Sequence, residues 1–182
     1  KVAIIEKGPM GGTCLNRGCI PSKIIIHAAD VAEEIRNSKS FGISSNITKI
    51  DFAHITKRAS SIVDKESAEI KRGILATKNI TLYNCEAKFV GKKTLKVGKE
   101  TITSNKIVIA AGTRPSIPPI EGLAGSGFIT SDEALRLKKQ PKTLTIMGGG
   151  YIGAELAHFF ASLGTKVTII QHDPFLVPNE DE

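Results

Sequence analysis

The stretch Gly11–Lys23, GGTCLNRGCIPSK, places two cysteines five positions apart, with glycines before and between them and a lysine at its end. An ideal helix separates positions five apart by about 7.5 Å along its axis, whereas a disulfide joins Cα atoms roughly 4.4–6.8 Å apart. The stretch therefore predicts a helix that begins here but is distorted, and Gly18 is the position that best tolerates a distortion. A strained, accessible bridge between Cys14 and Cys19 is more easily reduced than a structural one, which favours a reversible redox pair.

The cysteine count points to the same chemistry. An odd count of three, with one close pair, suits an intracellular redox motif better than an extracellular disulfide scaffold. We therefore expect a cytoplasmic protein, or one of the mitochondrial matrix in a eukaryote. The third cysteine, Cys85, is expected to be a small buried apolar residue. Zinc is the alternative for the pair, but two cysteines supply half of a tetrahedral site and the histidines are scattered, so no metal ligands are predicted.

Length and composition narrow the class of protein. The 182 residues suffice for one domain and part of another. Hydrophobic residues make up 41% of them, as in ordinary globular proteins, and no apolar run approaches the roughly 18 residues of a membrane span. The formal net charge of +7 does not require nucleic acid, because the lysines are dispersed, tryptophan is absent and a dinucleotide also carries negative phosphates. We expect neither a membrane nor a nucleic-acid partner.

Periodicity predicts alternating strands and helices. The predicted helices are the cysteine segment up to about residue 38, then 51–78, 132–139 with Ser131 as its cap, and 151–163. The predicted strands are 1–6, 80–83, 88–90, 94–97, 101–103, the continuous apolar run 107–110, 143–147 and 166–170. Both ends look cut, because a buried strand starts at Lys1 without a lead-in, so we expect a fragment of a longer protein.

A second glycine-rich motif, GGGYIG, occupies residues 148–153 and fits the dinucleotide-binding fingerprint G-x-G-x-x-G. The motif follows an apolar strand, opens an amphipathic helix and leads to a second strand, which is the context that the fingerprint requires. Gly148 allows a tight turn, Gly150 lets the backbone approach a pyrophosphate, and Gly153 lets helix and strand pack closely. The N-terminus of the helix then faces the phosphates.

Two strand ends bear on ribose binding. The acid expected about 20 residues after the fingerprint is replaced by Gln171, which can bond a ribose hydroxyl but has no charge to repel a 2′-phosphate. His172 could assist such a phosphate, so the choice between NAD and NADP stays open, with NAD preferred. Glu6 ends a strand that lacks its own glycine loop. It is either a surface acid or the ribose-binding acid of a first Rossmann unit whose fingerprint lies upstream.

Together these residues resemble the pyridine nucleotide–disulfide oxidoreductases, a family of flavin-dependent enzymes, over essentially the whole chain. Within the family, the Gly11–Lys23 motif looks most like that of the dihydrolipoamide dehydrogenases, while the segment 130–160 is also similar to mycothione reductases. The resemblance implies an α/β fold with a Rossmann-like FAD-binding domain over 1–140, incomplete at its N-terminus. The start of a second Rossmann domain, for NAD, would follow over 141–182.

The resemblance also implies roles for single residues. Cys14 would exchange disulfides with the substrate, Cys19 would face the flavin, and Lys23 would lie near the reactive edge of the flavin ring with Glu155 as its partner. An ordinary acid of a helix's first turn is the alternative for Glu155. The implied FAD contacts are Glu6, Gly11, Gly12, Thr13, Cys14, Lys23, Ala87, Ala111, Gly112 and Thr113. The implied NAD contacts are Gly148, Gly150, Tyr151, Ile152, Gly153, Glu155 and Gln171.

The implied reaction passes electrons between a dithiol, the Cys14–Cys19 disulfide, FAD and NAD. The dithiol would be dihydrolipoamide, free or on the lipoyl domain of a 2-oxoacid dehydrogenase complex, with mycothione, mercuric or another disulfide reductase of the family as alternatives. A homodimer would form through a C-terminal domain outside this chain, which would also supply the acid–base histidine. We therefore expect the isolated piece to bind FAD poorly and to turn over little.

A non-catalytic, redox-sensing module that binds a dinucleotide is the second class of function, because sensing needs only the cysteines and a nucleotide site.

Overall fold

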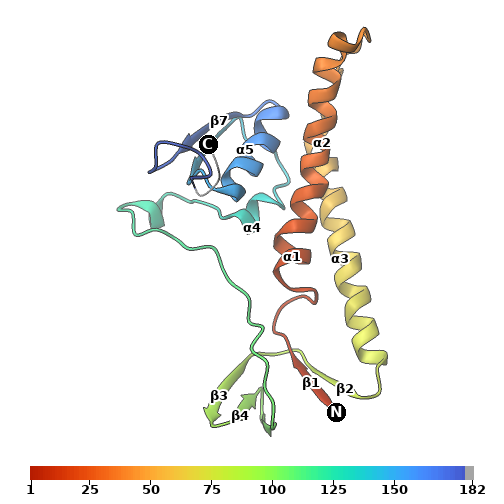
Figure 1. Cartoon of the computed structure of the whole chain (residues 1–182), viewed down its shortest axis with the longest axis vertical. Coiled ribbons are helices and arrows are strands. Elements are labelled where there is room, and N and C mark those ends of the chain that lie inside the picture. Colours follow the sequence, from red (N-terminus) through yellow and green to blue (C-terminus); the bar gives the residue numbers. More distant parts are fainter. Residues whose placement is uncertain (179–182) are drawn as a thin grey trace. The chain divides into compact units, whose positions relative to one another are not determined.

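The computed structural model describes residues 1–178, and Figure 1 shows the order of their elements. The helices are α1 (Gly12–Arg17), α2 (Cys19–Asn37), α3 (Phe52–Ala76), α4 (Ser131–Ala134) and α5 (Tyr151–Ser162), with 3-10 turns η1 (Ser38–Phe41) and η2 (Leu123–Gly125). The strands are β1 (Val2–Ile5), β2 (Ile80–Tyr83), β3 (Ala87–Gly91), β4 (Thr94–Val97), β5 (Glu100–Thr103), β6 (Thr143–Met147) and β7 (Lys166–Ile170). The predicted α/β class is confirmed.

The chain forms two compact units. The first unit combines Lys1–Asn16 with Val63–Arg114. The second unit combines Arg17–Ile62 with the described residues from Pro115 onward. The predicted domain boundary between residues 140 and 141 stays a prediction.

Two small sheets belong to the first unit. Strands β1 and β2 pair in parallel, with Val2 opposite Ile80. Strands β3, β4 and β5 form an antiparallel meander. Its turns contain Lys93 and Gly98, each with a φ of 57°. The strands predicted between residues 80 and 103 are therefore confirmed.

Two predictions for the first unit are wrong. The structure has no strand at 107–110, where Val108 and Ile109 are 88% and 74% exposed. A buried strand needs hydrogen-bonded neighbours, and among the described residues β1 pairs with β2 and no further strand extends that sheet. Cys85 is half-buried rather than buried. It lies in the loop between β2 and β3, with its Sγ 3.6 Å from the position that a Cβ on Gly98 would occupy.

Helix α3 follows from its periodicity. Its buried residues recur at steps of three and four, which places them on one helical face: they are Phe52, Thr56, Ala59, Val63 and Ser67. The helix begins after Asp51, whose Oδ1 accepts the N–H of His54 at 2.9 Å, as expected of an N-terminal cap. The helix contributes Phe52–Ile62 to the second unit and its remaining residues to the first.

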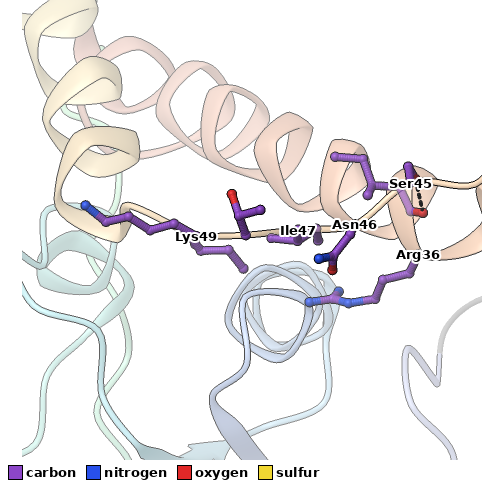
Figure 2. Close-up of a pocket in the computed structure, with 8 residues that line it drawn as sticks. Arg36, Ser45, Asn46, Ile47 and Lys49 are labelled. Carbon is purple, nitrogen blue, oxygen red and sulfur yellow. Dashed lines mark hydrogen bonds between the residues drawn. The ribbon is translucent and has the colours of Figure 1, made fainter.

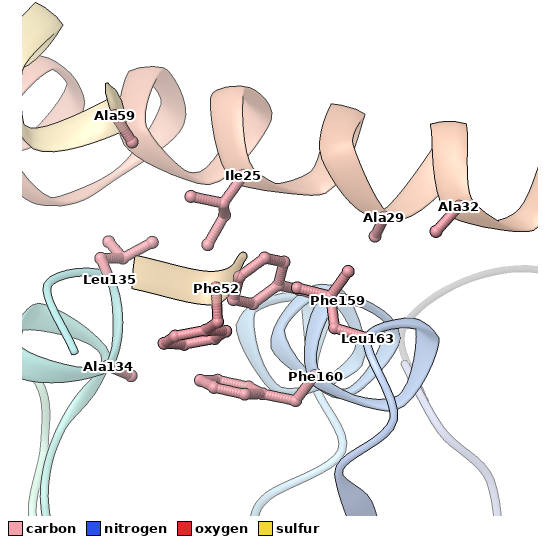
Figure 3. Close-up of a cluster of buried hydrophobic side chains, with 10 residues drawn as sticks. All are labelled: Ile25, Ala29, Ala32, Phe52, Ala59, Ala134, Leu135, Phe159, Phe160 and Leu163. Atoms are coloured by element: carbon pink, nitrogen blue, oxygen red, sulfur yellow. The ribbon is translucent and has the colours of Figure 1, made fainter. Parts of the chain in front are cut away.

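An aromatic core holds the second unit together (Figure 3). The rings of Phe159 and Phe160 on α5 meet edge to face with centroids 5.0 Å apart, and Phe52 on α3 lies 5.7 and 5.9 Å from them. Such ring pairs add about 0.5–1.5 kcal/mol each beyond their area burial. Ile25 and Ala29 on α2 are completely buried in the same cluster. The core therefore fixes α2 against α5.

The predicted strand–helix–strand unit of residues 143–170 is confirmed. Strands β6 and β7 are parallel, with Thr143 opposite Lys166 and Met147 opposite Ile170. Helix α5 connects them, so the glycine-rich loop lies between the end of β6 and the start of α5. This arrangement is the one in which a glycine loop binds phosphates.

The prediction for residues 131–139 is wrong at both ends. The helix ends at Ala134, and its N-cap is Thr130 rather than Ser131. The Thr130 hydroxyl accepts the N–H of Asp132 at 3.3 Å, while the Glu133 carboxylate accepts the N–H of Thr130 at 2.8 Å. The two bonds form a capping box with Thr130 as N-cap and Glu133 at the third helical position. With Ser131 as the N-cap, the third position would be Ala134, which has no carboxylate to complete the box. The hydrogen bonds from Thr130 lower the pKa of the Glu133 carboxyl.

Candidate functional site

The two cysteines of the motif lie on consecutive helices. Cys14 is in α1 and Cys19 is the first residue of α2, and both are exposed. Between them Gly18 leaves helical geometry, with φ −135° and ψ −119°. The predicted helix break at Gly18 is therefore confirmed. The redox pairing of Cys14 with Cys19 stays a prediction.

Lys23 and Glu155 meet within the second unit. Lys23 Nζ on α2 donates to Glu155 Oε1 on α5. Their side chains are 63% and 38% exposed. Exposed ion pairs contribute about 0–1 kcal/mol, so the aromatic core, and not this contact, holds the two helices together. The catalytic roles of both residues stay predictions.

The second glycine loop is tightly packed at Gly153 and open at Gly150. Gly148 has a φ of 103°, which favours glycine. A Cβ on Gly153 would lie 2.1 Å from the Gly148 carbonyl oxygen, so only glycine permits this packing of helix against strand. Gly150 is the N-cap of α5, and a Cβ added there would meet nothing within 4 Å. The open space over Gly150, at the start of a twelve-residue helix, fits the pyrophosphate of a dinucleotide.

Gln171 bonds directly to this loop. Its Oε1 accepts the N–H of Gly149 at 2.8 Å, and its Nε2 donates to Asp173 Oδ2 at 3.3 Å. The loop after β7 also contacts the glycines, because the N–H of Val177 donates to the Gly149 carbonyl at 2.8 Å. Tyr151 and Ile152, the other predicted NAD contacts, are exposed on the first turn of α5.

The first glycine loop and two other predicted FAD segments belong to the first unit. Gly11 and Gly12 have φ of 106° and 66°. A Cβ on Gly11 would lie 2.3 Å from Leu15 Cδ2, and one on Gly112 would lie 3.3 Å from Thr13 Oγ1. The structure thus brings residue 112 to the glycine loop, and side chains larger than hydrogen would crowd the two positions. Such a cradle fits the close approach of a dinucleotide to the backbone.

The remaining predicted FAD contacts of the first unit come from three separate segments of the sequence. Glu6 follows β1, and its Oε1 accepts the N–H of Gly8 at 2.8 Å. Ala87 begins β3 and is half-buried, whereas Ala111 and Thr113 are exposed in the segment after β5. A carboxylate anchored by one oxygen keeps its second oxygen for a ligand, as ribose binding by Glu6 requires.

Sequence reasoning missed an ion pair of the cysteine motif. Arg17 Nη1 lies 3.1 Å from Asp132 Oδ2, and both side chains are about three-quarters buried, at 25% and 24% exposed. The pair links the end of α1 to α4 within the second unit. A charged residue between the two cysteines was the available signal. Its partner lies 115 positions away, beyond the reach of any local pattern.

A cavity of about 490 Å³ lies elsewhere in the second unit (Figure 2). Its lining comes from the end of α2 and the extended segment 45–50, with Arg36 and Lys49 as its cationic side chains. None of the predicted site residues lines it. Over residues 1–178, no helix is long and apolar enough to cross a bilayer, and no three His, Cys, Asp or Glu side chains gather as metal ligands.

Comparison with known proteins agrees with the motifs. The profile of the family described as pyridine nucleotide-disulphide oxidoreductase matches residues 1–182. A mercuric reductase from Staphylococcus aureus is 35% identical over 181 residues, which cover 100% of this chain and 33% of that protein. A mycothione reductase from Mycobacterium tuberculosis is 35% identical over 188 residues, covering 100% and 41%. A dihydrolipoyl dehydrogenase from Bacillus subtilis is 36% identical over 190 residues, also covering 100% and 41%.

A solved structure supports the same assignment. The HOCl-induced flavoprotein disulfide reductase RclA from Escherichia coli matches with a TM-score of 0.85 at 33% sequence identity, over 100% of this chain and 39% of that chain. The chain thus spans 33–41% of the length of these relatives. Proteins of this class use FAD and NAD(P). With its family profile matched from the first residue to the last, the chain belongs to the pyridine nucleotide-disulphide oxidoreductase family.

Proposed function

We propose that the protein containing this chain moves an electron pair between a dithiol substrate and a pyridine nucleotide through Cys14 and Cys19. The observation that carries the proposal is the cysteine motif itself, with two exposed cysteines on either side of the helix break at Gly18. FAD, when bound, supplies the redox chemistry that connects the thiols to the nicotinamide. Glu6, the loop 11–14, Lys23, Ala87 and residues 111–113 would hold FAD.

The cysteine step is a thiol–disulfide exchange in which only sulfur atoms are oxidised or reduced. One thiolate of the reduced substrate attacks Cys14 Sγ, which breaks the Cys14–Cys19 bond and leaves the electron pair on Cys19 as a thiolate. The second substrate thiolate then attacks the substrate sulfur bound to Cys14 and releases Cys14 as a thiolate. The substrate leaves as a disulfide, two electrons remain on the cysteine pair, and two protons have left the substrate thiols. Lys23, whose ammonium is paired with the Glu155 carboxylate, would lie near the reactive edge of the flavin ring.

We assign NAD rather than NADP as the preferred nucleotide. Gln171 is the residue expected to meet the adenosine ribose, and its amide donates to the Asp173 carboxylate. A 2′-phosphate bound at Gln171 would therefore approach a negative charge, whereas a 2′-hydroxyl could donate to it. The pair Gln171 and Asp173 together would do what a single acid at the strand end does in the Rossmann fingerprint.

Dihydrolipoamide, free or on a lipoyl domain, is the proposed dithiol, and mercuric ion or mycothione reduction is the alternative within the family. The proposal includes a homodimer formed through a further domain. It also includes a cytoplasmic location, because one close pair among three cysteines suits an intracellular redox motif better than a disulfide scaffold.

The experiment is an assay of the purified full-length protein. We expect bound flavin absorbance and lipoamide-dependent formation of NADH, both with the wild type and with Cys85→Ser. Cys14→Ser and Cys19→Ser should retain flavin and lose the reaction. Turnover with a mercuric or mycothiol substrate instead would contradict dihydrolipoamide as the substrate, but not the electron path through Cys14 and Cys19. A colourless protein whose thiols respond only to peroxide would replace the enzyme with a redox sensor.

A further inference from the structure

One buried amide and one buried hydroxyl donate hydrogen bonds to backbone carbonyls of the first glycine loop. Asn16 on α1 is 6% exposed, and its Nδ2 donates to the carbonyls of Met10 and Gly12, each at 2.9 Å. The Pro9 carbonyl lies 3.5 Å from the same nitrogen. Ser67 on α3 is 7% exposed, and its Oγ donates to the Met10 carbonyl at 2.7 Å. All of these residues belong to the first unit.

The orientation of the Asn16 amide follows from its surroundings. Its Oδ1 is buried and has no hydrogen-bond partner among the described residues. Exchanging Oδ1 and Nδ2 would satisfy neither, because an oxygen would then face carbonyl oxygens. A buried acceptor without a partner costs stability. The unpaired Oδ1 of Asn16 therefore accompanies the hydrogen bonds that its NH₂ group donates to backbone carbonyls.

Holding those carbonyls determines where the neighbouring N–H groups point. No peptide bond in the described residues is cis, and in a trans peptide the C=O of one residue and the N–H of the next point in opposite directions. Drawing the carbonyls of Met10 and Gly12 toward Asn16 therefore turns the N–H groups of Gly11 and Thr13 away from it. The positive φ of Gly11 and Gly12 makes this backbone path accessible.

We infer that Asn16 and Ser67 are positioning residues for FAD, which preorganise the loop 10–13 so that its N–H groups meet the FAD pyrophosphate. Neither side chain touches the nucleotide, since both are buried against the carbonyl side of the loop. This inference rests on the proposed function for its ligand. It adds two residues that act through the backbone, one of them 57 positions from the Met10 carbonyl that it binds.

The test measures FAD affinity of the full-length apoprotein by titration, with unfolding temperature and NAD affinity as reference readouts. We expect Ser67→Ala to weaken FAD binding about tenfold, the equivalent of one hydrogen bond, and to leave NAD affinity within twofold. Thr56→Val is the matched control. Thr56 is also a buried hydroxyl on α3, but it donates to the Phe52 carbonyl of its own helix. Asn16→Leu, which keeps the shape and removes both donors, should weaken FAD binding further.

The outcomes separate this inference from the proposed function. Equal FAD affinity for the wild type, Ser67→Ala and Thr56→Val would overturn the positioning role, even if Ser67→Ala unfolds at a lower temperature. Equal losses of FAD affinity in Ser67→Ala and Thr56→Val would also overturn it, because the effect would then be general destabilisation. A wild-type protein that binds no FAD would instead contradict the proposed function. Since Ser67→Ala removes a single oxygen, the test holds even if Asn16→Leu fails to fold.

Discussion

Lys23 on α2 and Glu155 on α5 form an ion pair across 132 positions of sequence. Lys23 closes the cysteine motif and Glu155 follows the glycine fingerprint, so the contact joins the two motifs that sequence alone had marked. The aromatic core of Phe52, Phe159 and Phe160 brings the two helices together. Because the pair is half-exposed, its removal should affect chemistry more than stability.

Glu155→Gln tests this difference. We expect the rate of dithiol-dependent NADH formation by the full-length protein to fall by about a hundredfold, the scale on which one preorganised polar group contributes to catalysis. The unfolding free energy should change by less than about 1 kcal/mol. Glu69→Gln removes another surface ion-pair partner, on α3, and should change neither quantity. Equal rates for Glu155→Gln and the wild type would refute a catalytic role for the pair.

Substitutions at two glycines of the second loop should affect different properties, namely protein stability at Gly153 and NAD binding at Gly150. Gly153→Ala would place a Cβ 2.1 Å from a backbone oxygen, so we expect a fall in unfolding temperature with or without nucleotide. Gly150→Ala meets no atom within 4 Å, so it should lower the unfolding temperature far less than Gly153→Ala, through the poorer N-cap alone. It should weaken NAD binding. Gly73→Ala on α3 also meets open space and should stabilise by about 0.5–1 kcal/mol through helix propensity. Unchanged NAD affinity in Gly150→Ala would place the pyrophosphate elsewhere.

Nucleotide choice should depend on Asp173. Replacement by Asn removes the charge beside the Gln171 amide, and two unit charges about 4 Å apart in water interact by about 1 kcal/mol. We therefore expect the affinity for NADP⁺ relative to NAD⁺ to rise about fivefold, measured by calorimetric titration. His172→Asn is the neighbouring control, because His172 is exposed and its Nδ1 lies 3.6 Å from Asp173. A shift of the ratio in His172→Asn alone would assign the discrimination to the histidine.

The capping box of α4 predicts a pH-dependent stability. Its hydrogen bonds lower the pKa of Glu133 in the folded state, so the ionised carboxylate stabilises the fold above the ordinary pKa of 4.5. This contribution is lost as pH falls through the lowered folded value. Thr130→Ala should cost about 1 kcal/mol at neutral pH, and Glu133→Gln should destabilise at neutral pH and converge with the wild type in acid. Urea unfolding at both pH values measures this, with the exposed Glu34→Gln as control; a constant difference across pH would contradict it.

Most secondary structure was predictable because it follows local rules. The apolar steps of α3, the alternation of β2 to β5, and the break at Gly18 depend on neighbours within a few positions. The prediction of a strand at 107–110 was wrong because a strand also depends on a distant segment of the chain. Its apolar side chains satisfy the local pattern, but a strand is completed by hydrogen bonds to another segment, and none of the described strands supplies them.

The candidate site divides in the same way. Composition and spacing alone marked Cys14, Cys19 and the glycine loops as candidates, because chemical type and backbone freedom are properties of single residues and short motifs. The family resemblance also implied Glu155 as the partner of Lys23, and the structure contains that ion pair. Only the tertiary structure revealed Asp132 as the partner of Arg17, and Ser67 beside Asn16 on the Met10 carbonyl. These pairs depend on how helices pack, and packing is set by many weak contacts between distant parts of the chain that no local pattern encodes.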